Sequence, residues 1–291
     1  AQWEASGREL WVSDGTSAGT VLLKDIVPGR HFVGQELSCD FFGCEVVDVY
    51  APNSSDPSTF ATLGNRMVFS AESVDAGREL WVTDGTRAGT VLVKDIFPGG
   101  SSDPRSLVQV GDRVLFSANT RDSDRELWVS DGTPQGTAML KDIAPGAGEV
   151  GSSSPSWLTR VGGRLFFSAD TPAYGTELWV SDGASAGTVL VKDIASGPTS
   201  TSPLSLAQVG DRLFFTADTP ESGRELWVSD GTPGGTNLAA DIVPLAVGSD
   251  PLDLTAFGER VLFSAFHPAY GRELWSSDGT PQGTTLVRDI G

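Results

Sequence analysis

The residues in this chain that are most suited to catalysis or ion binding are acidic, and they recur in three series. Two carboxylates in different environments can act as a general acid and a general base, and several carboxylates gathered on one ion can bind calcium. The first series is Glu9, Glu79, Glu126, Glu177, Glu225 and Glu273. The second is Asp14, Asp84, Asp131, Asp182, Asp230 and Asp278. The third is Asp25, Asp95, Asp142, Asp193, Asp241 and Asp289.

Such near-identical acid positions are a poor match for catalysis, which needs carboxylates in unlike environments. Each aspartate of the second series precedes a glycine, and this pair predicts a turn in which the carboxylate accepts backbone N–H groups. A calcium ion at these turns is the alternative, but no copy has the D-x-D-x-D spacing of a calcium loop. For the glutamates and the third series, we expect ion pairs with the arginines of a neighbouring strand. These arginines are Arg66, Arg113, Arg164, Arg212 and Arg260.

Serine and histidine offer little support for an enzyme. The sequences around Ser17 and Ser185 match G-x-S-x-G, the nucleophile elbow, but that elbow needs a strand-to-helix turn, and here a strand is expected to follow. The only histidines are His31 and His267, and neither belongs to an H-E-x-x-H or Cys/His cluster. The sequence therefore predicts no catalytic residue, no metal ligand and no cofactor.

Aromatic residues outside the repeated pattern are the better candidates for binding. Trp3, Trp157, Tyr174 and Tyr270 stand where other copies of the repeat have different residues, and Tyr174 and Tyr270 occupy matching loops. Together with His31 and His267 they are the candidate ligand-binding residues. The repeated tryptophans lie inside apolar strands, so we expect them to pack between neighbouring repeats.

These residues are positioned by a repeat whose tryptophans are Trp11, Trp81, Trp128, Trp179, Trp227 and Trp275. The intervals indicate a period of about 48 residues, which is typical of a four-stranded propeller blade. In the unit that ends at Ile242, strands are expected at 204–209, 212–217, 225–229 and 236–242, each bounded by turn residues. The sequence thus predicts an all-β protein, a β-propeller of four-stranded antiparallel blades in a single domain over 1–291.

The first repeat is irregular. Its segment 1–11 aligns with 217–227, so the first two strands of this repeat are missing from the sequence. The insertion from Arg30 to Asn53 contains two segments, 35–42 and 45–50, which predict a hairpin that could supply two strands. We favour six blades with an irregular first blade, and five blades with an extra strand pair are the alternative.

The six units, among them ELWVSDGTSAGTVLLKDI and ELWVTDGTRAGTVLVKDI, resemble the ELWxxDGT repeats of large secreted bacterial proteins, notably those of myxobacteria. The resemblance covers nearly the whole chain except the insertion. It implies an exported, repeat-built β protein, and it brings no catalytic residues.

Composition narrows the partners and the compartment. The formal charge of −18 over 291 residues argues against nucleic acid, because an anionic surface repels phosphates. No apolar run approaches the roughly 20 residues of a transmembrane helix. Cys39 and Cys44 are the only cysteines, and we expect a local disulfide, hence an extracellular or cell-surface location.

Three functions remain open. The favoured hypothesis is a non-catalytic binding, adhesion or scaffold module, whose ligand would be a glycan or another cell-surface molecule. The second is a hydrolase or lyase whose site lies at the channel mouth near the insertion, with candidates His31, Glu36, Asp40, Glu45, Asp48 and His267. The third is an architectural fragment that self-associates through its incomplete first repeat, since unpaired strand edges invite pairing.

Overall fold

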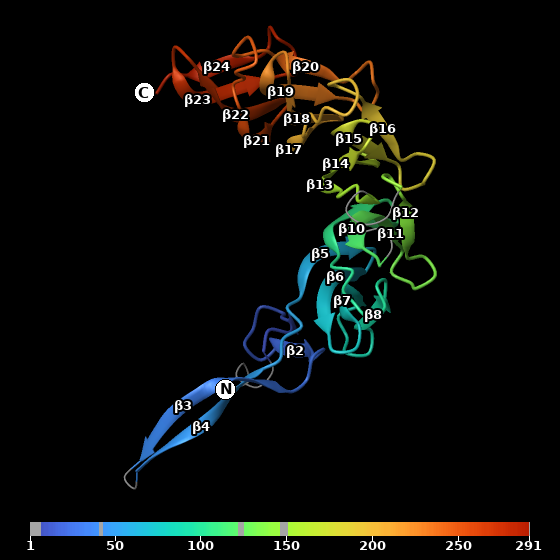
Figure 1. The fold of residues 1–291 in the computed structure, drawn as a ribbon, viewed down its shortest axis with the longest axis vertical. Coiled ribbons are helices and arrows are strands. Elements are labelled where there is room, and N and C mark those ends of the chain that lie inside the picture. The colour runs from blue at the N-terminus through green and yellow to red at the C-terminus, as the bar shows by residue number, and fades with distance from the viewer. Residues whose placement is uncertain (1–6, 41–42, 122–124, 146–150, 291) are drawn as a thin grey trace. The chain divides into compact units, whose positions relative to one another are not determined.

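A computed structural model describes residues 7–40, 43–121, 125–145 and 151–290, and all its regular elements are β-strands (Figure 1). The chain falls into two compact units, Ala1–Arg105 with Gly132–Pro134, and Ser106–Asp131 with Gln135–Gly291. Each unit is described by itself.

Each of the last five repeats folds into a four-stranded antiparallel sheet in which consecutive strands pair. In the first unit this sheet consists of β5 (Ser58–Leu63), β6 (Arg66–Ser73), β7 (Gly77–Thr83) and β8 (Val91–Lys94). The sheet that begins at the boundary consists of β9 (Arg105–Val110), β10 (Arg113–Asn119), β11 (Arg125–Ser130) and β12 (Ala138–Lys141). The all-β fold of four-stranded antiparallel propeller blades is confirmed.

The remaining three blades lie in the second unit. They are β13 (Ser156–Val161), β14 (Arg164–Thr171), β15 (Gly175–Ser181) and β16 (Val189–Lys192); β17 (Leu204–Val209), β18 (Arg212–Thr219), β19 (Gly223–Ser229) and β20 (Asn237–Ala240); and β21 (Leu252–Phe257), β22 (Arg260–His267), β23 (Gly271–Ser277) and β24 (Thr285–Arg288). In the blade chosen above, β17 has the predicted bounds, β18 and β19 are each two residues longer, and β20 is shorter.

The second and third strands of a blade are buried on both faces, which explains their continuous apolar runs. In β18, the residues from Leu213 to Ala217 are all buried, and in β19 so are those from Glu225 to Ser229. Apolar side chains on alternate faces of such a strand pack against the blades on either side. A sheet with only one buried face would instead show alternating polar residues.

The first repeat differs, as expected. β1 (Leu10–Val12) and β2 (Val21–Lys24) form a two-stranded sheet. The insertion forms the predicted hairpin from β3 (Arg30–Asp40) and β4 (Gly43–Pro52), which extends away from β2 in Figure 1. In the part of the chain that the structure describes, the hairpin strands pair only with each other, so the expectation that they supply the first repeat's missing strands is wrong.

The hairpin register sets Cys39 directly opposite Cys44. Directly opposed Cα atoms in antiparallel strands are about 4.5 or 5.5 Å apart, and both separations suit a disulfide. The side chains of these two cysteines lie outside the described residues, so the disulfide stays a prediction.

The aspartates of the second series occupy the turns predicted for them. Asp230 Oδ1 accepts the N–H of Thr232 at 2.8 Å and its hydroxyl at 2.7 Å, and Thr232 Oγ1 accepts the N–H of Gly235 at 3.0 Å. A Cβ on Gly235 would lie 2.1 Å from the carboxyl carbon of Asp230. The carboxylate therefore explains the second glycine of the D-G-T-x-x-G-T unit, whereas the first glycine, Gly231, has a φ of 86°.

This packing gives a prediction with a matched control in the neighbouring residue. Gly235→Ala should lower the free energy of unfolding by about 1–3 kcal/mol, because the new methyl group displaces the Asp230 carboxylate from its hydrogen bonds. Gly234→Ala should be neutral, since no atom lies within 4 Å of the position that a Cβ would take there and its φ is not positive. Urea unfolding of both variants measures the difference, and equal effects would contradict this role of the carboxylate.

Candidate functional site

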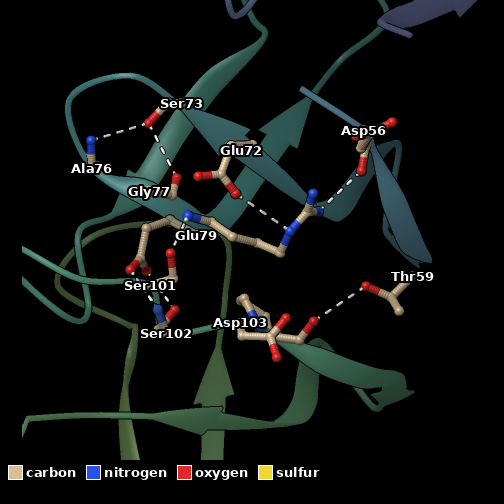
Figure 2. Close-up of polar contacts among 12 residues, drawn as sticks. Asp56, Thr59, Glu72, Ser73, Ala76, Gly77, Glu79, Ser101, Ser102 and Asp103 are labelled. Atoms are coloured by element: carbon tan, nitrogen blue, oxygen red, sulfur yellow. Dashed lines mark hydrogen bonds and ion pairs between the residues drawn. The ribbon is translucent and has the colours of Figure 1, made fainter. Parts of the chain in front are cut away.

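The buried glutamates bind the segment that follows them, and not the arginines. Glu79 Oε1 accepts the N–H of Ser102 at 2.9 Å, and Oε2 accepts the Ser102 hydroxyl at 2.5 Å and the N–H of Ile96 at 3.1 Å. Figure 2 shows Glu79 beside Ser101 and Ser102. Since Ser102 leads into the next blade, this carboxylate joins two repeats. We call this pairing of a glutamate with the Ser or Thr of the next segment the carboxylate clasp.

The carboxylate clasp recurs at every junction between repeats. Its pairs are Glu9–Ser55, Glu79–Ser102, Glu126–Ser153, Glu177–Thr201 and Glu225–Ser249. The hydroxyl-to-carboxylate distances lie between 2.5 and 2.7 Å. The insertion lies between β2 and Ser55, so it lengthens the connection without disturbing the first clasp.

The Ser or Thr of each clasp is the first residue of a Ser/Thr–Asp/Ser–Pro segment, which was not identified from the sequence. In all five copies the second residue has a positive φ, between 42° and 49°. In each copy its N–H donates to the carbonyl of the residue before the clasp glutamate, as Asp103 does to Arg78 at 3.1 Å. The signal was present, because Ser/Thr–Asp/Ser–Pro stands before the first strand of each of the five complete repeats.

The prediction that the glutamates form ion pairs with the second-strand arginines, such as Arg164 and Arg212, is wrong. Arg164 and Arg212 donate instead to the backbone carbonyls of Asp230 and Asp278, at 2.7 and 2.8 Å. Each guanidinium also lies over a phenylalanine of its own strand. Arg164 and Arg212 thus hold the aspartate turn of the following repeat, whereas Arg260 lies 3.8 Å from Asp278 of its own repeat. The glutamates accept N–H and hydroxyl donors instead, although among the residues that the structure describes the buried Oε1 of Glu177 has no hydrogen-bond partner.

The third series of aspartates also departs from expectation. Within the described residues, the buried Oδ1 atoms of Asp25, Asp95 and Asp193 have no hydrogen-bond partner. Asp193 uses its other oxygen to accept the N–H of Gly197 at 2.9 Å. The predicted arginine partners for these three carboxylates are therefore wrong.

Apolar and lysine contacts complete each junction. Trp179 packs into a cluster with Val129, Leu140 and Ile143 of the preceding repeat, which confirms that the repeated tryptophans pack between blades. Lys192 Nζ donates to the carbonyl of Thr236 in the following repeat at 2.9 Å. Lys24 and Lys141 make the same contact with Thr90 and Thr188.

Burial raises the pKa of four clasp glutamates. It does so for Glu79, Glu126 and Glu225, with hydrogen bonds from the clasp serine opposing the shift. Burial raises the pKa of Glu177 from 4.5 to about 7. By contrast, hydrogen bonds from the Thr16 hydroxyl and N–H hold the pKa of exposed Asp14 below its usual range.

The first repeat exposes apolar side chains whose equivalents in the next four repeats are buried. Val12 is 38% exposed, whereas its equivalent Val82 is 4% exposed, and Leu10 and Trp11 are only half-buried. A cavity of about 460 Å³ is lined by Gly7, Arg8, Glu9, Trp11 and Thr20.

A second cavity, of about 490 Å³, lies on the side of β1 that faces the next blade. It is bounded by Leu10, Val12 and Leu23 and by the turns 62–67 and 83–85. In the described residues β1 pairs only with β2. The structure therefore presents an apolar strand with cavities beside it, a surface suited to polypeptide strand addition.

The predicted ligand-binding residues are distributed over several elements. His267 and Tyr270 form a stacked pair with ring centroids 4.8 Å apart, and Trp275 lies 6.1 Å from His267. Tyr174 is exposed at the equivalent turn of another blade. These exposed aromatic rings remain candidates for ligand stacking.

The other candidates lie apart from this pair. Trp157 is exposed at a bulge in β13 with a φ of 56°, a conformation that the equivalent residues of the other four complete blades share. His31 hydrogen-bonds Asn53 at the base of the insertion hairpin, at 3.1 Å. Trp3 lies outside the described residues.

The candidates for an enzyme at the insertion are not placed by the structure. The side chains of Glu36, Asp40, Glu45 and Asp48 lie outside the described residues. Within the part that is described, no group of three or more His, Cys, Asp or Glu residues could hold a metal ion. Nor does any described segment form a helix long and apolar enough to cross a bilayer.

Comparisons with known proteins yield structural similarity only. No family model and no curated protein matches the chain. Among solved structures, puromycin hydrolase aligns over 98% of this chain and 42% of its own, at 15% identity and a TM-score of 0.49. The GH74 xyloglucanase from Xanthomonas campestris aligns over 77% of this chain and 36% of its own, at 16% identity and a TM-score of 0.42. This chain thus spans less than half the length of either enzyme.

The raised pKa of Glu177 predicts a pH-dependent stability. Between pH 4.5 and about 7 the unfolded chain releases a proton that the folded protein retains, so stability falls as pH rises through this window. Glu177→Gln should flatten that decline by up to about 1 kcal/mol per pH unit in urea unfolding. The exposed Glu259→Gln is the control. Parallel pH profiles for the wild type and Glu177→Gln would contradict the prediction.

Proposed function

We propose that this protein is a non-catalytic scaffold module of an exported bacterial protein, and that its first repeat binds polypeptide β-strands. The observation that carries the proposal is the exposure of Val12 and the partial exposure of Leu10 and Trp11 beside two cavities, at positions that the next four blades bury. Exposed apolar strand edges recruit strands from other chains.

The complete blades indicate which strand would fit. In the fifth repeat, β18 pairs with β19 and places Phe214 and Phe215 opposite Val228 and Trp227. The rings of Phe215 and Trp227 lie 6.5 Å apart. Trp11 and Val12 are the first-repeat equivalents of Trp227 and Val228, so a strand rich in phenylalanine would complete the first repeat.

The recurring acids support a structural role over a catalytic one. The clasp glutamates accept hydrogen bonds from the next segment, and aspartates such as Asp14 accept them within their own turn. The same hydrogen-bonding roles of these acids therefore recur from repeat to repeat, and the acids are not gathered into a single site. A carbohydrate ligand is the alternative binding function, and the exposed Tyr270 is where it would be sought.

A peptide with the sequence of residues 203–219, the inner hairpin of a complete blade, tests the proposal. Fluorescence anisotropy should show saturable binding to the protein. Val12→Lys should weaken binding at least about tenfold, because a charged side chain on a strand blocks strand addition. Val91→Lys is the matched control, since Val91 is 43% exposed and lies on the outer strand of a complete blade.

Amide hydrogen exchange of the first repeat supplies a second measurement. Bound peptide should slow exchange at Leu10–Val12 and leave exchange in β19 unchanged. Failure of the peptide to bind, or equal binding by the Val12→Lys and Val91→Lys variants, would exclude strand addition at this repeat.

A further inference from the structure

Within its unit, the last blade exposes the face that the preceding blades of the unit bury against their successors. Phe257 is 70% exposed and Leu274 is 38% exposed, whereas their fifth-repeat equivalents Val209 and Leu226 are 2% and 0% exposed. Val287 and Ile290 on the same face are also exposed, and they correspond to buried residues of the fifth repeat. We call the surface formed by Phe257, Leu262, Leu274, Val287 and Ile290 the outgoing face.

A clasp glutamate is present at this face. Glu273 is 9% exposed, and in the described part of the chain it accepts one hydrogen bond, from the N–H of Ile290 at 3.2 Å. The equivalent Glu225 accepts the N–H of Val243 and, in addition, the N–H and hydroxyl of Ser249. A carboxylate this deeply buried is costly without such donors. Glu273 therefore has the position and the burial of a clasp glutamate, the hydrogen-bond acceptor of the pair.

We infer that the outgoing face binds a Ser/Thr–Asp/Ser–Pro segment that leads a further repeat of this type. The inference rests on the five internal clasps and is independent of the function proposed for the first repeat, which lies in the other unit. The occupant's chemistry follows from those clasps position by position.

The first residue of the segment donates its hydroxyl and N–H to Glu273. The N–H of the second residue donates to the carbonyl of Arg272, as that of Asp250 does to Arg224 at 3.0 Å. The sixth residue is apolar and packs on the outgoing face. Its internal equivalents, Leu158, Leu206 and Leu254, pack in this way into the clusters that join successive repeats.

The probe is a labelled peptide with the sequence of residues 100–108, GSSDPRSLV, which carries the first, second and sixth positions of the segment. Fluorescence anisotropy should show saturable binding to the whole chain. Glu273→Gln in the protein and Ser102→Ala in the peptide should each weaken binding at least about tenfold, because each removes a charge-assisted hydrogen bond. Glu259→Gln, on the same blade, should leave binding unchanged.

Phe257→Ser keeps the test valid if Glu273→Gln does not fold. Phe257 is largely exposed, so its replacement should spare the fold and weaken binding through the loss of apolar contact. The peptide used for the first repeat begins at Pro203 and lacks the clasp residue, so failure at one site does not imply failure at the other.

Three results would overturn the inference. One is the absence of saturable binding to the wild-type protein. Another is binding that survives both Glu273→Gln and the Ser102→Ala peptide. The third is concentration-dependent dimerisation that Phe257→Ser abolishes while the peptide does not bind, which would assign the outgoing face to a second copy of the chain.

Discussion

The buried carboxylate at each junction is the interaction on which the repeats of this protein depend. A glutamate inside an apolar strand must be satisfied by hydrogen-bond donors or it destabilises the fold. Glu126 meets this requirement with the N–H of Ile143 from its own repeat and with the N–H and hydroxyl of Ser153 from the next segment. One side chain therefore fixes both the end of one blade and the start of another.

The carboxylate clasp explains other features of the chain. The Ser/Thr–Asp/Ser–Pro segment adopts the same strained backbone in every copy, with a positive φ at a non-glycine residue. In four copies the glutamate and the neighbouring carbonyl hold two successive N–H groups, and at Thr201 the Thr176 carbonyl accepts both. The clasp also explains why the insertion is tolerated. The hairpin β3–β4 is added before Ser55, and Asn53 returns to Gly29 and Pro28 through hydrogen bonds that close its base. The chain then enters the next clasp as it does elsewhere.

Sequence reasoning predicted the fold well because its signals are local. The Asp-Gly turns, the apolar strands and the hairpin each follow from residues within a few positions of one another. The clasp was missed because Glu79 and Ser102 are distant in sequence, and the arginines were assigned by charge alone although backbone N–H groups satisfy a carboxylate equally well. The open strand edge of the first repeat was predicted from its missing strands, but the exposed face of the last blade was not. Leu274 and Leu226 are the same residue in the same motif, and only the presence of a following blade distinguishes them.

The same physics gives the protein its candidate interaction surfaces. A repeat fold buries its apolar faces only against neighbouring repeats, so Trp11 at one end and Phe257 at the other remain partly exposed within their respective units. In the part of the chain that the structure describes, β1 pairs only with β2, and Glu273 accepts a hydrogen bond only from the N–H of Ile290. Binding of polypeptide strands and segments is the function that we propose for these surfaces.

A double-mutant cycle on one internal clasp tests this account most directly. Glu126→Gln, Ser153→Ala and the double variant would be compared by urea unfolding at a pH above the raised pKa of the glutamate. If the carboxylate and the hydroxyl hold the two repeats together, the two substitutions should be coupled by about 1–3 kcal/mol. Additive effects would show that the junction is held by apolar packing alone, and would contradict the clasp as the interaction on which the repeats depend.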